Sequence, residues 1–163
     1  MNWIDEALAA GFSAAAVMDV KDLVVVREYR KYCEENLCGC YDNLPACPPK
    51  CGTVDEMIAS MQKYEKALVL QSIVTPENEE LIDAYKRAKA AHNGMQDALL
   101  GKMAAEGLTD VLVMSAGPWK KYSCMSAYCV DAQKMADHVG MDCWKNDGCC
   151  RYFSLVLGQE FQR

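Results

Sequence analysis

The residues with the most distinctive chemistry in this sequence are its ten cysteines among 163 residues. That share is below the roughly 8–10% of a small secreted disulfide scaffold. Residues 1–11 carry two acids and only a short apolar stretch, so we read no export signal and expect a cytoplasmic protein. Disulfides are rare in a reducing cytosol. The thiols are therefore candidate metal ligands or redox groups first, and small buried hydrophobic side chains second.

Half of the cysteines lie in one stretch of twenty residues, 33–52, which also contains three prolines and two glycines. So many residues that break helices and strands predict an ordered loop that something must hold in place. Thiolates are soft ligands that select zinc, copper(I) or iron–sulfur clusters. The loop cysteines are Cys33, Cys38, Cys40, Cys47 and Cys51.

The spacing of these cysteines favours an iron–sulfur cluster over zinc. A zinc finger or ribbon generally uses two Cys-x2-Cys pairs, and residues 33–52 contain none. Iron–sulfur clusters tolerate looser spacing and often end in a Cys-Pro step, which is present at Cys47-Pro48. A zinc site and a metal-free, packed loop are the two alternatives that the spacing leaves open.

The same loop resembles a known family. The run from Arg30 to Gly52, with Cys33, Cys38-Gly39 and Cys47-Pro48-Pro49 at its centre, resembles the predicted metal-binding family called domain of unknown function 2284. Weaker similarities extend from about Gly11 to Leu157; they are Tyr64, Ala67-Leu68, His92-Asn93, Ala116-Gly117-Pro118, Met125, Ala127-Tyr128, Asp131 and Tyr152-Phe153. The resemblance implies metal binding, with an iron–sulfur cluster as the implied group and no established reaction.

The resemblance also implies which cysteines bind the metal. The three loop cysteines of the family fall on Cys33, Cys38 and Cys47. Family members continue after Gly117-Pro118 with a second cysteine-rich loop, which residues 119–124 replace in shortened form here. We therefore expect one site, whose fourth ligand comes from elsewhere in the chain. The candidates are Cys40, Cys51, Cys124 and Cys129.

Two of these candidates are preferred as the fourth ligand. Cys124 follows the predicted strand that ends at Ser115, so it should share a sheet edge with the cysteine loop. Cys51 is close in sequence, although it lies where the chain leaves the loop. The alternative is a second, irregular site built from the four candidates. The predicted metal ligands are thus Cys33, Cys38, Cys47, Cys51 and Cys124.

The other reactive residues have simpler interpretations. Cys143, Cys149 and Cys150 are expected to pack in or beside strands, because adjacent side chains of a strand face opposite ways. His92 lies on an apolar helix face, where a hydrogen-bonded structural histidine is favoured over a metal ligand. No nucleophile elbow, phosphate-binding loop or dinucleotide fingerprint is present. The sequence therefore predicts no catalytic residue.

The elements that must position the loop alternate between strands and helices. A capping residue, Asn2, and a stop at Gly11 predict a short first helix, and Thr53 with Glu56 predicts a capping box. The other helices are predicted over 53–63, 76–107 and 127–139, the strands over 12–20, 23–26, 66–74 and 110–115, and a hairpin over 141–145 and 150–157. We therefore expect one α/β domain, 1–163, with a mixed, largely parallel sheet covered by helices, a cysteine-rich loop and a C-terminal hairpin.

The charge balance limits the partners. Lys plus Arg number 17 and Asp plus Glu number 23, a net charge of −6 that argues against nucleic-acid or anionic-membrane binding. No apolar run is long enough to span a membrane. We expect one iron–sulfur cluster, four-iron rather than two-iron, for electron transfer or for redox or metal sensing, with a redox protein as partner. The alternative is a structural zinc-thiolate site in a binding or interaction module.

Overall fold

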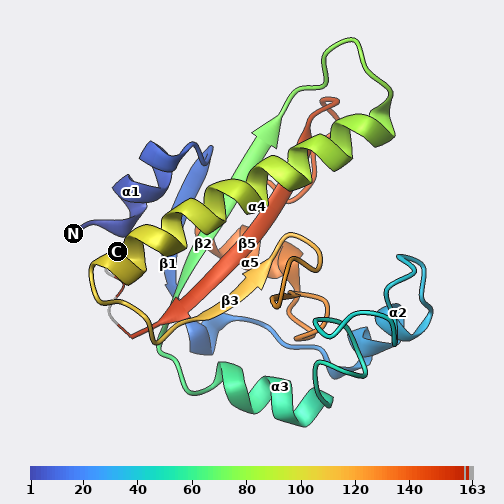
Figure 1. Ribbon diagram of the computed structural model, residues 1–163, viewed down its shortest axis with the longest axis vertical. Coiled ribbons are helices and arrows are strands. Elements are labelled where there is room, and N and C mark those ends of the chain that lie inside the picture. The colour runs from blue at the N-terminus through green and yellow to red at the C-terminus, as the bar shows by residue number, and fades with distance from the viewer. Residues whose placement is uncertain (160, 162–163) are drawn as a thin grey trace.

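A five-stranded sheet forms the centre of the computed structural model, which describes residues 1–159 and 161 (Figure 1). The strands, in their order across the sheet, are β1 (Ala14–Asp19), β2 (Lys66–Val74), β5 (Cys150–Gly158), β3 (Leu112–Ser115) and β4 (Ser123–Cys124). The helices are α1 (Trp3–Ala10), α2 (Arg30–Glu34), α3 (Val54–Met61), α4 (Leu81–Ala105) and α5 (Ala132–Val139), with short 3-10 turns at Val20–Asp22 and Arg27–Tyr29.

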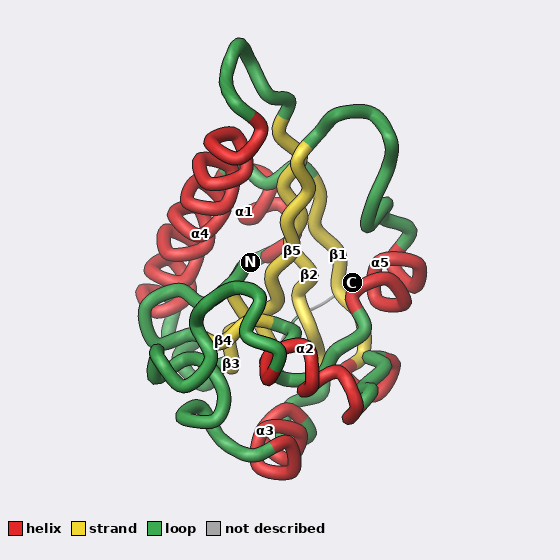
Figure 2. The backbone as a smooth tube through the Cα atoms, turned by 90° about the vertical axis from the view of Figure 1, so that its right-hand side faces the viewer, coloured by secondary structure: helices red, strands yellow, loops and turns green. Residues whose placement is uncertain are grey.

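Helices cover both faces of the sheet (Figure 2). On one face α1 and α4 pack on β2 and β5, with Ala7, Leu99 and Val156 fully or almost fully buried. On the other face α3 and α5 contribute Met61 and Met135 to a second buried cluster. Apolar side chains on both faces explain why β2 reads as an almost continuous apolar run, as expected for a strand buried on both sides.

The expectation of a largely parallel sheet is wrong. The pairs β1–β2, β2–β5 and β5–β3 are antiparallel, and β3–β4 is the parallel pair among the described residues. Strands β2 and β3, which α4 connects, do run in the same direction. The C-terminal strand β5 lies between them in the opposite direction. The alternation of strands and helices correctly predicts the crossover from β2 to β3 through α4. It does not indicate that a later strand, β5, lies between those two strands.

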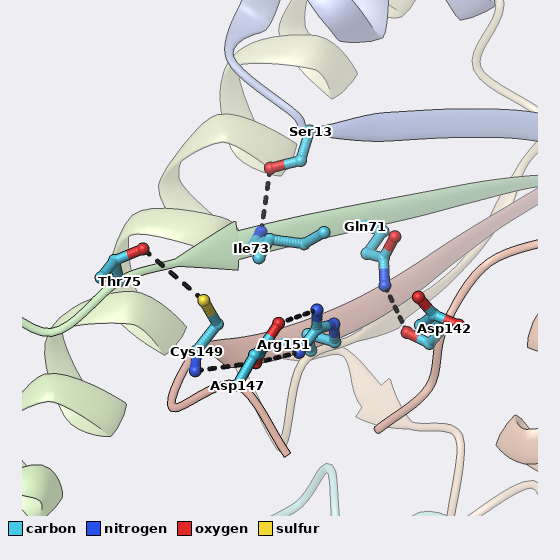
Figure 3. A network of polar contacts seen from close by, with 8 residues as sticks. All are labelled: Ser13, Gln71, Ile73, Thr75, Asp142, Asp147, Cys149 and Arg151. Atoms are coloured by element: carbon cyan, nitrogen blue, oxygen red, sulfur yellow. Dashed lines mark hydrogen bonds and ion pairs between the residues drawn. The ribbon is translucent and has the colours of Figure 1, made fainter. Parts of the chain in front are cut away.

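The expected C-terminal hairpin is also wrong. Both edges of β5 are already occupied, by β2 and β3, so residues 141–145 have no edge of β5 left to pair with. The side chain of Gln71 instead donates a hydrogen bond to the carbonyl of Asp142 at 2.8 Å (Figure 3). The predicted turn at Asp147 does exist. Its carboxylate pairs with both terminal nitrogens of Arg151, at 2.9 and 2.7 Å, and so braces the start of β5.

Several local predictions are confirmed, because local chemistry decides them. Asn2 caps α1, Gly11 ends it in the left-handed conformation, and Thr53 forms the capping box of α3. Other limits move. Asp131 caps α5 and delays its start, α4 begins at Leu81, and the predicted strand 23–26 is reduced to a single bridge with Val130.

One buried side chain of α4 is a structural cost. Gln96 is fully buried, and neither its amide nitrogen nor its amide oxygen has a hydrogen-bond partner among the described residues. An unsatisfied buried polar group costs roughly 1–3 kcal/mol. We therefore expect Gln96→Met, which keeps the chain length and removes both polar atoms, to raise the free energy of unfolding by about 1–2 kcal/mol.

Chemical denaturation of the two proteins measures this effect. The matched control is Asn93→Leu, one turn earlier on α4, because the Asn93 amide is buried but bonds both backbone groups of Ala116, at 2.9 and 3.1 Å. That variant is expected to be destabilised. A loss of stability in Gln96→Met as well would contradict the assignment of an unsatisfied amide.

Candidate metal centre

The cysteine loop, residues 33–52, lies beside the edge of the sheet formed by β3 and β4. Cys33 is carried by the short helix α2 and Cys124 by the edge strand β4, where it pairs with Ser115 of β3. In Figure 1 the cyan loop lies close to the orange segment that holds β4. The loop and a segment more than seventy residues later in the sequence are thus brought to one place.

The loop is held in shape by turns rather than by regular elements, as the sequence predicts. Asn36 and Gly39 adopt the left-handed conformation, and the Asn36 side chain accepts a hydrogen bond from the backbone N–H of Tyr41 at 2.9 Å. The Asp42 N–H donates to the carbonyl of Pro48 at 2.7 Å, and the Cys51 N–H donates to that of Cys47 at 3.0 Å. These few bonds fold the loop back on itself and gather its thiols.

Four thiols form a closed ring of neighbours. Cys33 interacts electrostatically with Cys38 and with Cys124, and Cys47 interacts with Cys38 and with Cys124. We call Cys33, Cys38, Cys47 and Cys124 the thiol ring. Cys47 is buried, Cys33 and Cys124 are half-buried, and Cys38 is exposed. Three members come from the loop and the fourth from β4.

The other candidate ligands are also neighbours of members of this ring. Cys51 interacts with Cys47 and Cys124, and its thiol lies 3.4 Å from the sulfur of Met57. Cys40 interacts with Cys38 and Cys47, and its thiol also points to the Cys38 carbonyl at 3.6 Å. Cys129 is fully buried, and its thiol donates to the carbonyl of Arg27 at 3.7 Å. The structure therefore brings all five predicted ligand positions into one neighbourhood.

Two of the ring thiols, Cys33 and Cys47, are held in their neutral form. Burial, reinforced by the neighbouring thiols, raises the pKa of Cys33 to about 11 and the pKa of Cys47 to about 12. Within residues 1–159 and 161, no group of three or more His, Cys, Asp or Glu side chains already stands in the geometry of a metal site. For a metal to bind, Cys33 and Cys47 therefore have to lose their protons, and the four ring thiols have to turn toward a common centre.

A buried arginine, Arg30, holds the end of the cysteine loop in place. Arg30 is 8% exposed; its Nη1 donates to the carbonyl of Gly52 at 2.9 Å, and its Nη2 donates to that of Ala127 at 3.0 Å. Nη2 also lies 3.1 Å from the sulfur of Met57 in α3. One guanidinium thus ties together the end of the cysteine loop, the segment after β4 and α3. Sequence reasoning missed this role, although Arg30 stands in the family-like run three residues before Cys33.

A second basic side chain approaches the centre from α4. Lys89 acts on the Cys40 thiol and lowers its pKa against the larger upward effects of burial and of Cys38. Its aliphatic chain also lies beside the backbone of Gly117, at the end of β3. In a chain with a net charge of −6, basic side chains therefore lie at the thiols.

A cleft opens beside β4. It has a volume of about 240 Å³, and its walls include Gly117, Cys124, Val130, Arg151 and Phe153. Of the four thiols of the ring, Cys124 lines this cleft.

The remaining cysteines lie away from the thiol ring. Cys150 is fully buried against Ala84 and Ala88 of α4, whereas its neighbour Cys149 is half-buried with its sulfur 3.5 Å from the Thr75 hydroxyl (Figure 3). Cys143 packs against the buried cluster beneath α5. The interpretation as packing residues is confirmed for Cys143 and Cys150, whereas Cys149 lies outside the buried clusters.

The interpretation of His92 as a structural residue is also confirmed. His92 is fully buried, and its two ring nitrogens are hydrogen-bonded to the hydroxyls of Ser72 and Ser154, at 2.6 and 2.7 Å. Its neighbour Asn93 bonds both backbone groups of Ala116 and so fixes the end of β3. This pair therefore positions the strand that leads to Cys124 and does not supply a ligand.

Burial makes His92 a source of acid sensitivity, because desolvation lowers its pKa to about 4 from the usual 6.5. The unfolded chain binds a proton between these two values that the folded protein excludes. Stability is therefore full above pH 6.5 and falls by roughly 3 kcal/mol as the pH drops toward 4. Denaturation of wild type and His92→Gln, which keeps polar contacts but does not titrate, isolates this effect. A difference between the two proteins that does not change from pH 7 to pH 4.5 would contradict it.

Comparison with known proteins gives one match. A family described as predicted metal-binding protein (DUF2284) matches residues 16–121. That segment includes Arg30, the whole cysteine loop and the end of β3, and it stops before Cys124. No curated protein and no solved structure matches the chain. No helix in the described part of the chain is both long enough and apolar enough to cross a membrane.

Proposed function

Because this chain belongs to the DUF2284 family of predicted metal-binding proteins, we propose that it binds its metal through Cys33, Cys38, Cys47 and Cys124. The bound group that we propose is one four-iron iron–sulfur cluster, used for electron transfer or for redox or metal sensing. The observation that supports this most is the thiol ring, in which β4 adds a fourth thiol to the three of the loop.

The donor set suits such a cluster. Four thiolates are the usual ligands of a four-iron cluster, and the Cys-Pro step at Cys47 is frequent in these sites. When bound, the cluster supplies the ability to accept and release single electrons. The protein's part is to gather the four thiols at the sheet edge, to bury Cys47, and to place Arg30 and Lys89 nearby.

The exposed side of the loop supports a role with a redox partner protein. Leu37 is 85% exposed and Tyr32 is 52% exposed, and both lie next to ring cysteines in the sequence. Electron transfer needs a partner to approach the metal closely, and apolar side chains beside the thiols provide a surface for such an approach. We propose this face of the loop as the place of contact.

A structural zinc site is the alternative, because four thiolates bind zinc equally well in chemical terms. In that case the zinc ion only fixes the turns of the loop, and the protein is a binding or interaction module without redox activity. Zinc–thiolate and iron–sulfur centres differ in colour, since only the latter absorbs broadly near about 400 nm.

Anaerobic purification followed by elemental analysis and absorption spectroscopy separates the two. We expect brown protein with equal amounts of iron and inorganic sulfide and a band at about 400 nm. Colourless protein with one zinc per chain would contradict the iron–sulfur cluster and support the structural zinc site. Protein that holds neither metal after reconstitution with iron and sulfide, or with zinc, would contradict metal binding at this site.

A further inference from the structure

Arg30 carries a charge that the surrounding protein does not balance. It is 8% exposed, and its two terminal nitrogens donate to neutral partners, the carbonyls of Gly52 and Ala127 and the sulfur of Met57. The Nε–H is buried without a partner. Among the ion pairs of the described residues, none joins Arg30 to a carboxylate.

A buried cation without a counter-charge is costly, and proteins normally pair such a group. The groups near Arg30 that can become anions are thiols. Its charge acts on Cys33 and Cys51, and Cys33 follows it by three residues in α2. The charge balance of this pocket is therefore incomplete while the thiols stay neutral.

Metal binding supplies the missing negative charge. Four thiolates around a divalent metal ion, or around a four-iron core of the same charge, leave a centre with a net charge of about −2. That charge develops in the thiol ring, next to the guanidinium. Because the guanidinium itself is largely shielded from water, the attraction between the two is screened less than it is between two surface charges.

We propose that Arg30 is the counter-charge of the metal centre and a positioning residue for it. The inference rests on the proposed function, because it assigns the buried guanidinium to the same site. By opposing the negative charge of the centre, Arg30 strengthens metal binding. In an iron–sulfur centre, it also favours the reduced state, which carries one more negative charge.

Three variants separate charge from structure. Arg30→Gln removes the charge and keeps a hydrogen-bonding side chain, whereas Arg30→Lys keeps the charge and loses the planar fork. The matched control is Arg27→Gln, which alters net charge equally at a side chain that is 58% exposed and pairs with Asp55. We expect metal affinity, measured by competition with a chelator, to fall roughly tenfold or more in Arg30→Gln. The loss should be much smaller in Arg30→Lys and absent in Arg27→Gln.

The reduction potential of the anaerobically reconstituted protein gives a readout that a purely structural role does not move. A tenfold shift of the one-electron equilibrium toward the oxidised state in Arg30→Gln corresponds to a potential lower by about 59 mV. Equal losses in Arg30→Gln and Arg30→Lys would assign Arg30 a structural role instead. Unchanged affinity in Arg30→Gln would also overturn the counter-charge.

Wild-type protein provides a test that does not depend on the folding of a variant. Zinc serves as a diamagnetic probe, and nitrogen-15 spectra record the side-chain N–H signals of the arginines. We expect the Arg30 Nε–H signal to shift as one equivalent of zinc binds, while that of Arg27 stays in place. An unmoved Arg30 signal in zinc-loaded protein overturns this inference alone, whereas failure of the wild type to bind zinc or a cluster overturns the proposed function.

Discussion

Replacing Cys33, Cys38 or Cys47 singly with serine is expected to remove the metal from the protein. Each substitution exchanges a soft thiolate for a hydroxyl that stays protonated, so one of four bonds to the metal is lost. Loss of an outer partner of a metal ligand already costs about 10–100-fold in affinity, so loss of a ligand should exceed about 100-fold. Metal per chain after anaerobic purification and desalting measures the effect.

The chain offers a matched control for this series. Cys143 is a half-buried thiol that packs beneath α5, away from the loop. Cys143→Ser should keep its full metal content. Full metal content in Cys38→Ser, the most exposed member of the thiol ring, would show that the assignment of the loop ligands is wrong.

Metal binding is expected to release the protons of Cys33 and Cys47. The pKa of Cys33 is about 11 and that of Cys47 about 12, well above the ordinary value of 9.0, so these thiols are protonated at neutral pH. A metal binds the thiolates and displaces the protons. These two thiols should therefore make the affinity for zinc rise with pH by about two orders of magnitude per pH unit near neutrality.

Calorimetry of zinc binding in two buffers of different ionisation enthalpy counts these protons directly. The Cys51→Ser variant is the control, since a thiol outside the ring should not change the count. Release of fewer than two protons would mean that Cys33 and Cys47 do not act together as ligands.

The same raised pKa values make the fold of the metal-free protein less stable at alkaline pH. A thiol whose pKa is higher in the folded than in the unfolded chain stabilises the fold below the unfolded value, about 9. That contribution is lost as the pH rises toward the folded values of Cys33 and Cys47.

Sequence reasoning succeeds here where the deciding contacts are local. The caps at Asn2 and Thr53 and the strand β2 follow from residue type and spacing. The cysteine loop follows from its prolines and glycines. The direction of the sheet could not be predicted, because it depends on β5 entering between two strands that are far away in the sequence.

The candidate site, too, could be predicted from the sequence only in part. The loop thiols are recognisable from their motif, and the placement of Cys124 at the sheet edge follows from the strand ending at Ser115. The role of Arg30 is not visible in the sequence. Its partners are the backbone carbonyls of Gly52 and Ala127 and the sulfur atom of Met57, which come from three separate segments of the chain. Only the folded chain shows that its charge lies beside the thiols without a carboxylate.

We propose that β4 completes the metal site through Cys124, a residue beyond the segment that matches the family. The most direct test compares metal content in Cys124→Ser and Cys51→Ser, two half-buried thiols that neighbour each other at the centre. We predict that Cys124→Ser loses the metal and that Cys51→Ser retains it. Retention of the metal in Cys124→Ser, together with its loss in Cys51→Ser, would contradict the claim and place the whole site within the loop.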